Sequence, residues 1–216
     1  MQLFRVHWQG ERGSAVTQPR RYVLTGGPGV GKTTLIQALR RRGHLVVREA
    51  ATDVIAARQA QGCAEPWREP EFVDAVARLQ HRRRIVADAD GDLQIHDRSP
   101  LCTLALARHL GRPVGPDLAV ELDRIVRQRS YQRLVFLIGP LGFVTRTAAR
   151  QIDYAESLAF ARVHEQVYAA YGHRLVDVPA GPVHERITLI EQHLSTPTRG
   201  LPNRLTLHNV HYRIRD

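Results

Sequence analysis

Short apolar runs alternate along this chain with longer segments in which apolar side chains recur every three or four positions. The first pattern is typical of buried strands and the second of amphipathic helices. Strands are predicted at residues 21–25, 44–48, 92–97, 134–138 and 174–178. Helices are predicted at residues 32–40, 50–61, 72–87, 100–110, 116–131, 153–171 and 182–194. Because this alternation favours parallel strands joined by right-handed crossovers, we expect a doubly wound α/β fold, a five-stranded parallel sheet flanked by helices.

The two ends of the chain do not follow this alternation. Residues 1–20 form a polar leader, in which residues 3–8 alternate enough for an extra edge strand. In the tail at residues 196–216, residues 205–214 also alternate, and the pattern leaves open whether the tail adds an edge strand or is mobile. The folded domain is therefore expected at residues 21–195.

The distribution of positive charge points to one loop. The chain has 31 Lys and Arg residues, and Lys32 is its single lysine. Lys32 lies in a full match to the phosphate-binding pattern G-x-x-x-x-G-K-[ST] between a predicted strand and a predicted helix. The residues expected to bind the phosphates are Gly26, Gly27, Pro28, Gly29, Val30, Gly31, Lys32, Thr33 and Thr34.

This loop is expected to bind the phosphates of ATP. Gly26, Gly29 and Gly31 can adopt backbone angles that other residues avoid, so that successive N–H groups turn toward phosphate oxygens at the start of a helix. Lys32 is then expected to contact the β- and γ-phosphates, and the hydroxyl of Thr33 to bind Mg²⁺. The motif predicts a P-loop NTPase.

Residues 97–100, Asp-Arg-Ser-Pro, indicate the type of phosphate chemistry. Asp97 ends a predicted strand, where a carboxylate can hold Mg²⁺ beside Thr33. Motor ATPases commonly have a glutamate next, whereas here Arg98 follows, and a cation suits a phosphate or an anionic acceptor. The alternative is that Arg98 pairs with a nearby acid. A GTPase is disfavoured because the guanine-reading motif N/T-K-x-D needs a second lysine.

Three further residues are candidates for the catalytic site. Glu49 follows a predicted strand at the carboxyl edge of the sheet, where it could accept a proton from a substrate hydroxyl or, alternatively, cap the next helix together with Asp53. Arg146 and Arg150 follow the fourth predicted strand and are four residues apart, so they would share one face of a helix. Their position matches the lid of small-molecule kinases, and solubility of the surface is the alternative.

Charge and composition bear on partners and location. The formal net charge of +10 raises nucleic acid or an anionic lipid surface as a partner. The arginines are spread along the chain and aromatic residues make up 6%, so a platform that stacks bases is not indicated. Cys63 and Cys102 suggest neither a metal site nor a disulfide framework, and no signal peptide or membrane span is evident. A cytoplasmic location is expected.

The chain resembles the AAA_28-type P-loop family, whose ATPase domain is similar to the ribosylnicotinamide kinase domain of NadR proteins. The likeness covers about residues 21–194 and rests on residues 25–35, 47–51, 97–100, 162–165, 168, 172, 178–179 and 185–186. It implies ATP and Mg²⁺ binding and a kinase-like active site. It departs from the kinase pattern in the lid, where alanines precede Arg150 in place of the usual acidic residue.

Two hypotheses follow. The first is a Mg²⁺-dependent phosphotransferase that acts on a small hydroxyl-bearing metabolite, nucleosides included. Lys32 and the loop amides would hold the nucleoside triphosphate, Thr33 and Asp97 the metal, and Glu49 the acceptor. Arg98, Arg146 and Arg150 would contact the transferred group. The second is an AAA-type ATPase or a nucleotide-dependent regulatory module with a protein or polyanionic partner.

Overall fold

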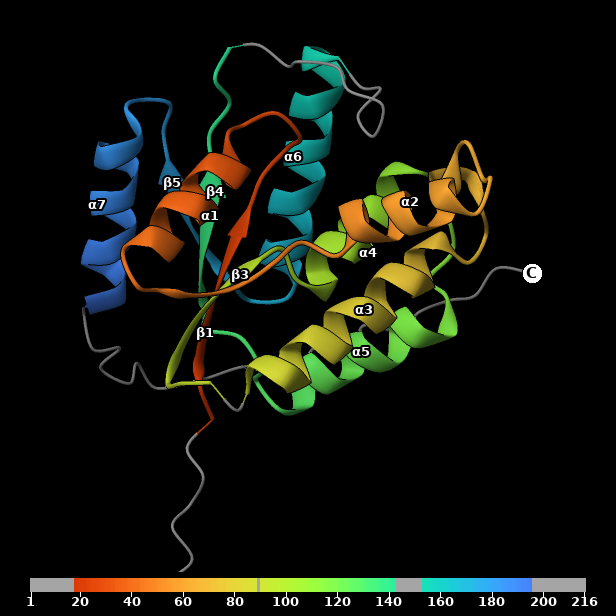
Figure 1. Ribbon diagram of the computed structural model, residues 1–216, viewed down its shortest axis with the longest axis horizontal. Coiled ribbons are helices and arrows are strands. Elements are labelled where there is room, and N and C mark those ends of the chain that lie inside the picture. Colours follow the sequence, from red (N-terminus) through yellow and green to blue (C-terminus); the bar gives the residue numbers. More distant parts are fainter. Residues whose placement is uncertain (1–17, 89, 143–152, 196–216) are drawn as a thin grey trace, which may run out of the picture.

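The computed structural model describes residues 18–88, 90–142 and 153–195. Its sheet has the strand order β2-β3-β1-β4-β5, and every pair of neighbouring strands is parallel (Figure 1). The strands are β1 (Arg20–Thr25), β2 (Leu45–Val47), β3 (Leu93–Asp97), β4 (Leu134–Ile138) and β5 (Arg174–Val178). The predicted five-stranded parallel sheet is confirmed.

The helices follow the predicted spacing closely. They are α1 (Lys32–Arg41), α2 (Ala51–Ala60), α3 (Phe72–Ala87), α4 (Pro100–His109), α5 (Pro116–Arg127), α6 (Tyr154–Ala170) and α7 (Val183–Ser195), with a short 3₁₀ helix, η1 (Pro66–Arg68). The prediction was too long for α5, which ends four residues before Tyr131. Arg129 has a φ of +48°, and Tyr131 then turns inward and packs its ring edge-to-face against His96.

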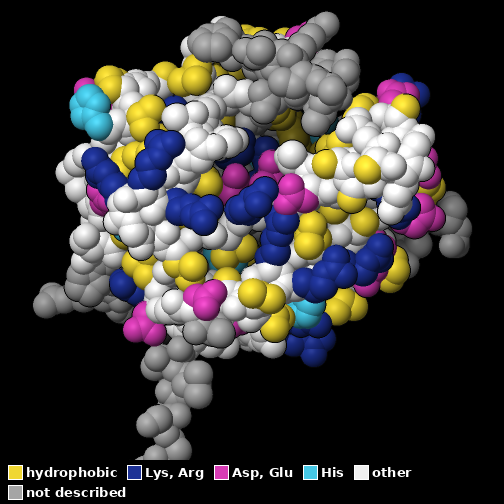
Figure 2. All heavy atoms as spheres, viewed as in Figure 1, with side chains coloured by type: hydrophobic (Ala, Val, Ile, Leu, Met, Phe, Trp, Pro, Cys, Tyr) yellow, Lys and Arg dark blue, Asp and Glu magenta, His cyan; other side chains and the backbone are white. Residues whose placement is uncertain are grey.

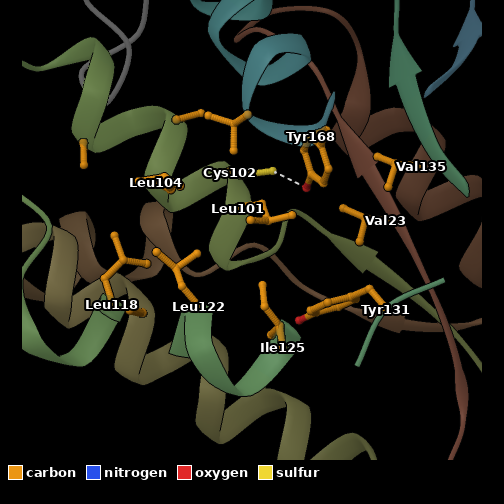
Figure 3. Packing of buried hydrophobic residues seen from close by; sticks show 14 of the residues in the cluster. Val23, Leu101, Cys102, Leu104, Leu118, Leu122, Ile125, Tyr131, Val135 and Tyr168 are labelled. Atoms are coloured by element: carbon orange, nitrogen blue, oxygen red, sulfur yellow. Dashed lines mark hydrogen bonds between the residues drawn. The ribbon is translucent and has the colours of Figure 1, made fainter. Parts of the chain in front are cut away.

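Helices cover both faces of the sheet (Figure 1). Alternate residues of a strand point to opposite faces. In β1, Tyr22 and Leu24 pack with α1 and α7, whereas Val23 packs with α4 and α6 on the opposite face. Figure 3 shows the hydrophobic cluster that contains Val23, in which Leu101 and Leu104 of α4 lie near Leu118 and Leu122 of α5. The core therefore has one cluster on each side of the sheet, and a third, smaller cluster lies between α2 and α3.

The loops that leave the carboxyl ends of β1, β2 and β3 lie at one edge of the sheet, where ligands bind in open α/β folds. The leader and tail predicted from the sequence fall almost entirely outside the described residues. Within the described ranges, none of the helices combines the length and the apolar character that crossing a membrane would require.

Candidate active site

The phosphate-binding loop has the backbone that its glycines predicted. The φ angles of Gly26, Gly29 and Gly31 are +130°, +83° and +82°, a region that favours glycine. Helix α1 then begins at Lys32, so its N-terminal end faces the loop. Lys32 Nζ is buried and donates hydrogen bonds to the carbonyl oxygens of Gly26 at 3.1 Å and Gly27 at 2.7 Å.

The surroundings of Lys32 act on its pKa in opposite directions. Burial, reinforced by the nearby Arg98 guanidinium, lowers the pKa of Lys32 to about 7, although Asp97 and Glu49 act in the opposite direction. An ammonium group held this far from water gains strongly from an added anion. The loop is therefore suited electrostatically to bind phosphate.

Two helices from the far end of the sequence hold this loop in place. From α6, Ser157 Oγ donates to the carbonyl oxygen of Pro28 at 2.7 Å. From α7, the buried Arg186 donates from Nη1 to the carbonyl oxygen of Val30 and from Nη2 to that of Gly139, both at 3.2 Å. No role was predicted for Ser157 or Arg186. No local pattern distinguishes Ser157 from other polar helix residues, and Arg186 was noted only as part of a segment that carries the family resemblance.

Asp97 ends β3 beside the loop, as predicted. Its Oδ1 atom is buried and has no hydrogen-bond partner among the described residues. Burial and the charge of Glu49 raise the pKa of Asp97 to about 6, against the opposing effect of Lys32 and Arg98. A buried carboxylate oxygen without a partner is costly, and a cation would remove that cost.

These features fit Mg²⁺. Thr33 and Asp97 line the same cavity and offer hard oxygen ligands. Among the described residues, no cluster of three or more His, Cys, Asp or Glu side chains could hold a metal ion. Mg²⁺ in kinases is usually bound by one or two protein oxygens together with phosphate and water, and Thr33 and Asp97 fit that arrangement.

Arg98 and Glu49, predicted independently, meet at the edge of the site. Arg98 Nε donates to Glu49 Oε1 at 2.5 Å, although 49 positions separate the two residues. Arg98 thus pairs with an acid, as the alternative interpretation proposed. That acid is Glu49, which is itself a candidate catalytic residue. The φ of Arg98 is +75°, unusual for a residue with a side chain and costly enough to suggest a functional constraint.

Glu49 lines the cavity, and it contacts the start of α2 through the side chain of Thr52. Ala50 is the N-cap of α2 and no side chain caps it, while Asp53 forms an ion pair with Arg83. Glu49 Oε2 accepts a hydrogen bond from Thr52 Oγ1 at 2.8 Å. Although burial opposes it, the charges of Arg98 and Lys32 hold the pKa of Glu49 below its ordinary value, so this carboxylate stays ionised.

A cavity of about 540 Å³ joins these groups. Its lining includes Lys32, Thr33, Asp97, Arg98 and Glu49. It also includes an apolar recess formed by side chains that pack in one cluster, Ile55, Trp67, Phe72, Val76 and Leu106, together with Leu110, Phe160 and the ring of His109. Gln80 and Thr103 add a polar pair to this wall, in which Thr103 Oγ1 donates to Gln80 Oε1 at 2.8 Å. Figure 2 shows acidic and basic side chains side by side near the middle of this face, between α1 and α2.

The remaining predicted residues, Arg146 and Arg150, lie outside the described residues. The structure adds the apolar wall of the cavity, for which the sequence predicted no functional role. It also adds His164, which lies beside Arg98. His164 and Arg186 both belong to the segments that carried the family resemblance, so the signal was present but had no role attached.

Solved structures with a similar fold include NadR protein and a deoxyadenosine kinase. The crystal structure of NadR protein in complex with NAD and AMP-PNP matches with a TM-score of 0.60 and 16% identity, over 86% of this chain and 52% of that chain. Deoxyadenosine kinase from M. mycoides with bound dATP matches with a TM-score of 0.51 and 14% identity, over 82% of this chain and 100% of that chain. This chain thus spans about half the length of the NadR chain.

Comparison by sequence gives the family. No curated protein matches the sequence. A family model described as an AAA domain matches residues 21–186. This match covers most of the chain, and the similar structures agree with it in their fold, a five-stranded parallel sheet flanked by helices. The chain belongs to the AAA_28 family of AAA domains.

Proposed function

We propose that this protein is a Mg²⁺-dependent phosphotransferase that transfers the γ-phosphoryl group of ATP to a hydroxyl group of a small, nucleoside-like metabolite. One observation carries the proposal: a single cavity connects the phosphate-binding loop to the Glu49–Arg98 pair and to an apolar recess. An apolar recess of this kind, with a few polar groups at its wall, suits the binding of a small molecule beside the phosphate site.

Residues of the loop would bind the triphosphate. The backbone N–H groups of the loop and Lys32 would contact the phosphates, and Thr33 and Asp97 would hold the metal. When bound, Mg²⁺ supplies charge that offsets the negative charge of the phosphates. Among the described residues the Oδ1 atom of Asp97 has no hydrogen-bond partner, and this supports the assignment.

Glu49 would receive the acceptor. An ionised carboxylate can accept a hydrogen bond from the acceptor hydroxyl and orient it toward the γ-phosphorus. As the new O–P bond forms, the bond from the γ-phosphorus to the β–γ bridging oxygen breaks, ADP leaves, and Glu49 takes the hydroxyl proton. Arg98 would offset the negative charge on the transferred group, joined by Arg146 and Arg150.

The recess suits a flat acceptor. The aromatic side chains of Trp67, Phe72 and Phe160 offer apolar surfaces for a ring, while Gln80 and Thr103 offer hydrogen bonds at one wall. The fold neighbours whose structures hold NAD or dATP are consistent with a nucleoside-like acceptor.

The test is to incubate the protein with γ-labelled ATP, Mg²⁺ and a panel of nucleosides, sugars and vitamins, and to follow transfer of the label. We expect Glu49→Gln to lower transfer by about 100-fold or more, as loss of a general base does, with ATP binding retained. Glu185→Gln, which changes an exposed glutamate, is the matched control. Hydrolysis without transfer to any acceptor, together with salt-dependent binding to nucleic acid or anionic lipid, would favour the regulatory ATPase instead.

A further inference from the structure

His164 lies on α6 with none of its surface exposed, and both of its ring nitrogens have partners. Nδ1 lies 2.8 Å from the carbonyl oxygen of Phe160, and Nε2 lies 3.1 Å from Arg98 Nη1. A guanidinium can only donate hydrogen bonds, so Nε2 must accept one. The proton of the neutral ring then belongs on Nδ1, which donates to the carbonyl of Phe160.

We propose that His164 is a positioning residue that holds the guanidinium of Arg98 against Glu49 in the acceptor site. This inference rests on the proposed function. Arg98 is held from two sides, by Glu49 through Nε and by His164 through Nη1, and neither contact uses Nη2. Two contacts fix the plane of the guanidinium, so the pair keeps one geometry as an acceptor enters.

The position of His164 on α6 also connects the acceptor site to the phosphate site. Ser157 and His164 are seven residues apart, two helical turns, so they lie on the same face of the helix. Ser157 binds the phosphate loop at Pro28, and His164 binds Arg98. A single rigid helix therefore fixes the distance between the loop and the arginine.

The surroundings of His164 keep the ring neutral, as the accepting role requires. Burial and the charge of Arg98 hold the pKa of His164 well below its ordinary value, with Lys32 and His109 acting in the same direction and the Phe160 carbonyl against it. The ring of Phe160, whose centroid lies 4.3 Å away, covers it from one side. Protonation of the ring would turn Nε2 from a hydrogen-bond acceptor into a donor, and two donors would then face each other at the contact with Arg98.

Two substitutions separate the two contacts of the ring. His164→Asn places its amide near the position of Nδ1, so it can keep the contact to Phe160 but has nothing to offer Arg98. His164→Gln reaches the position of Nε2 with a carbonyl oxygen that can accept from Arg98. If His164 only stabilised α6, the asparagine would be the better replacement, because it retains the contact within the helix.

The experiment measures phosphoryl transfer and ATP affinity for both variants. We expect His164→Asn to lower kcat by about 100-fold, the cost of a misplaced catalytic group, while the Kd for ATP is unchanged. His164→Gln is expected to retain most of kcat. Equal losses in the two variants, or a greater loss in His164→Gln, would overturn the proposal.

Two measurements test the contact without relying on catalysis. Nitrogen NMR of the wild-type protein at neutral pH is expected to show His164 as the neutral Nδ1–H tautomer, and an imidazolium or an Nε2–H tautomer would refute the assignment. A double-mutant cycle on stability that combines His164→Asn with Arg98→Met is expected to show coupling, and additive effects would refute it. If the wild-type protein phosphorylates no acceptor, the proposed function fails while these two results still decide the role of His164.

Discussion

Lys32 donates a hydrogen bond from Nζ to the carbonyl oxygen of Gly27 at 2.7 Å. The ammonium is therefore held inside the loop, where it is expected to contact the phosphates of ATP. Lys32→Ala removes a charge that contributes directly to phosphate binding. Hydrogen bonds to charged groups contribute about 1.5–3 kcal/mol. We expect the Kd for Mg-ATP to rise about 100-fold, measured by calorimetry, with the fold intact because burying the ammonium is itself costly. Arg40→Ala, in the exposed last turn of α1, is the control, and undiminished ATP affinity in Lys32→Ala would contradict the assignment.

Gly27 is required by the approach of α6. A Cβ atom at position 27 would lie 2.5 Å from Ser157 Oγ and 2.6 Å from its carbonyl oxygen. Because one of these atoms belongs to the backbone, Gly27→Ala must displace α6 or the loop, and a loss of about 1–3 kcal/mol in the free energy of unfolding is expected. Denaturant unfolding measures this loss. At Gly181, a Cβ would come no closer than 3.7 Å to a neighbour, so Gly181→Ala should be tolerated, and equal losses in the two variants would exclude the steric explanation.

His96 makes the protein sensitive to acid. It is buried in β3, and burial lowers its pKa to about 3 from an ordinary value of 6.5, helped by Arg21 and Arg84. Between these values the unfolded chain binds a proton at this position and the folded protein does not, so the contribution to stability is complete above pH 6.5 and is lost as the pH falls. The loss is about 1.4 kcal/mol per pH unit.

His96→Gln should therefore make the fall in unfolding free energy below pH 6.5 shallower by about 1.4 kcal/mol per pH unit. Denaturant unfolding of the two proteins at several pH values between 6.5 and 4.5 measures the difference in slope. His184→Gln, which removes a histidine whose side chain is 73% exposed, serves as the control. Parallel pH profiles for the wild-type protein and His96→Gln would show that His96 titrates normally in the folded state.

The sheet and the phosphate loop were predictable because their signals are local. The loop is encoded within residues 26–33, and the glycines with positive φ are those that the pattern marked. Arg98 and Glu49 could each be nominated from their place after a strand, since parallel strands bring their carboxyl ends to one edge. Their pairing could not be predicted, because the geometry of a side-chain contact between two loops depends on packing.

The contacts made by α6 and α7 were beyond the sequence pattern. His164 is 66 positions from Arg98, and Arg186 is 156 positions from Val30. A helical pattern places an arginine on the solvent-exposed face, yet Arg186 is 4% exposed because backbone carbonyls receive its guanidinium. The end of α5 was misjudged for a related reason, since the burial of Tyr131 against His96 outweighed the tendency of the segment to continue as a helix.

Arg186 is expected to affect nucleotide binding more than stability. Its charge is buried, no carboxylate among the described residues pairs with it, and its Nε has no partner there. The cost of burying this cation offsets much of what its hydrogen bonds to Val30 and Gly139 contribute, so Arg186→Met should change the unfolding free energy by less than about 1 kcal/mol. The same cation lies behind the phosphate loop, where its field and its hold on the backbone both favour an anion. We expect the Kd for ATP to rise about tenfold in Arg186→Met, by calorimetry, and less in Arg186→Lys, which keeps the charge. A large loss of stability in Arg186→Met with ATP affinity unchanged would show that Arg186 only supports the fold.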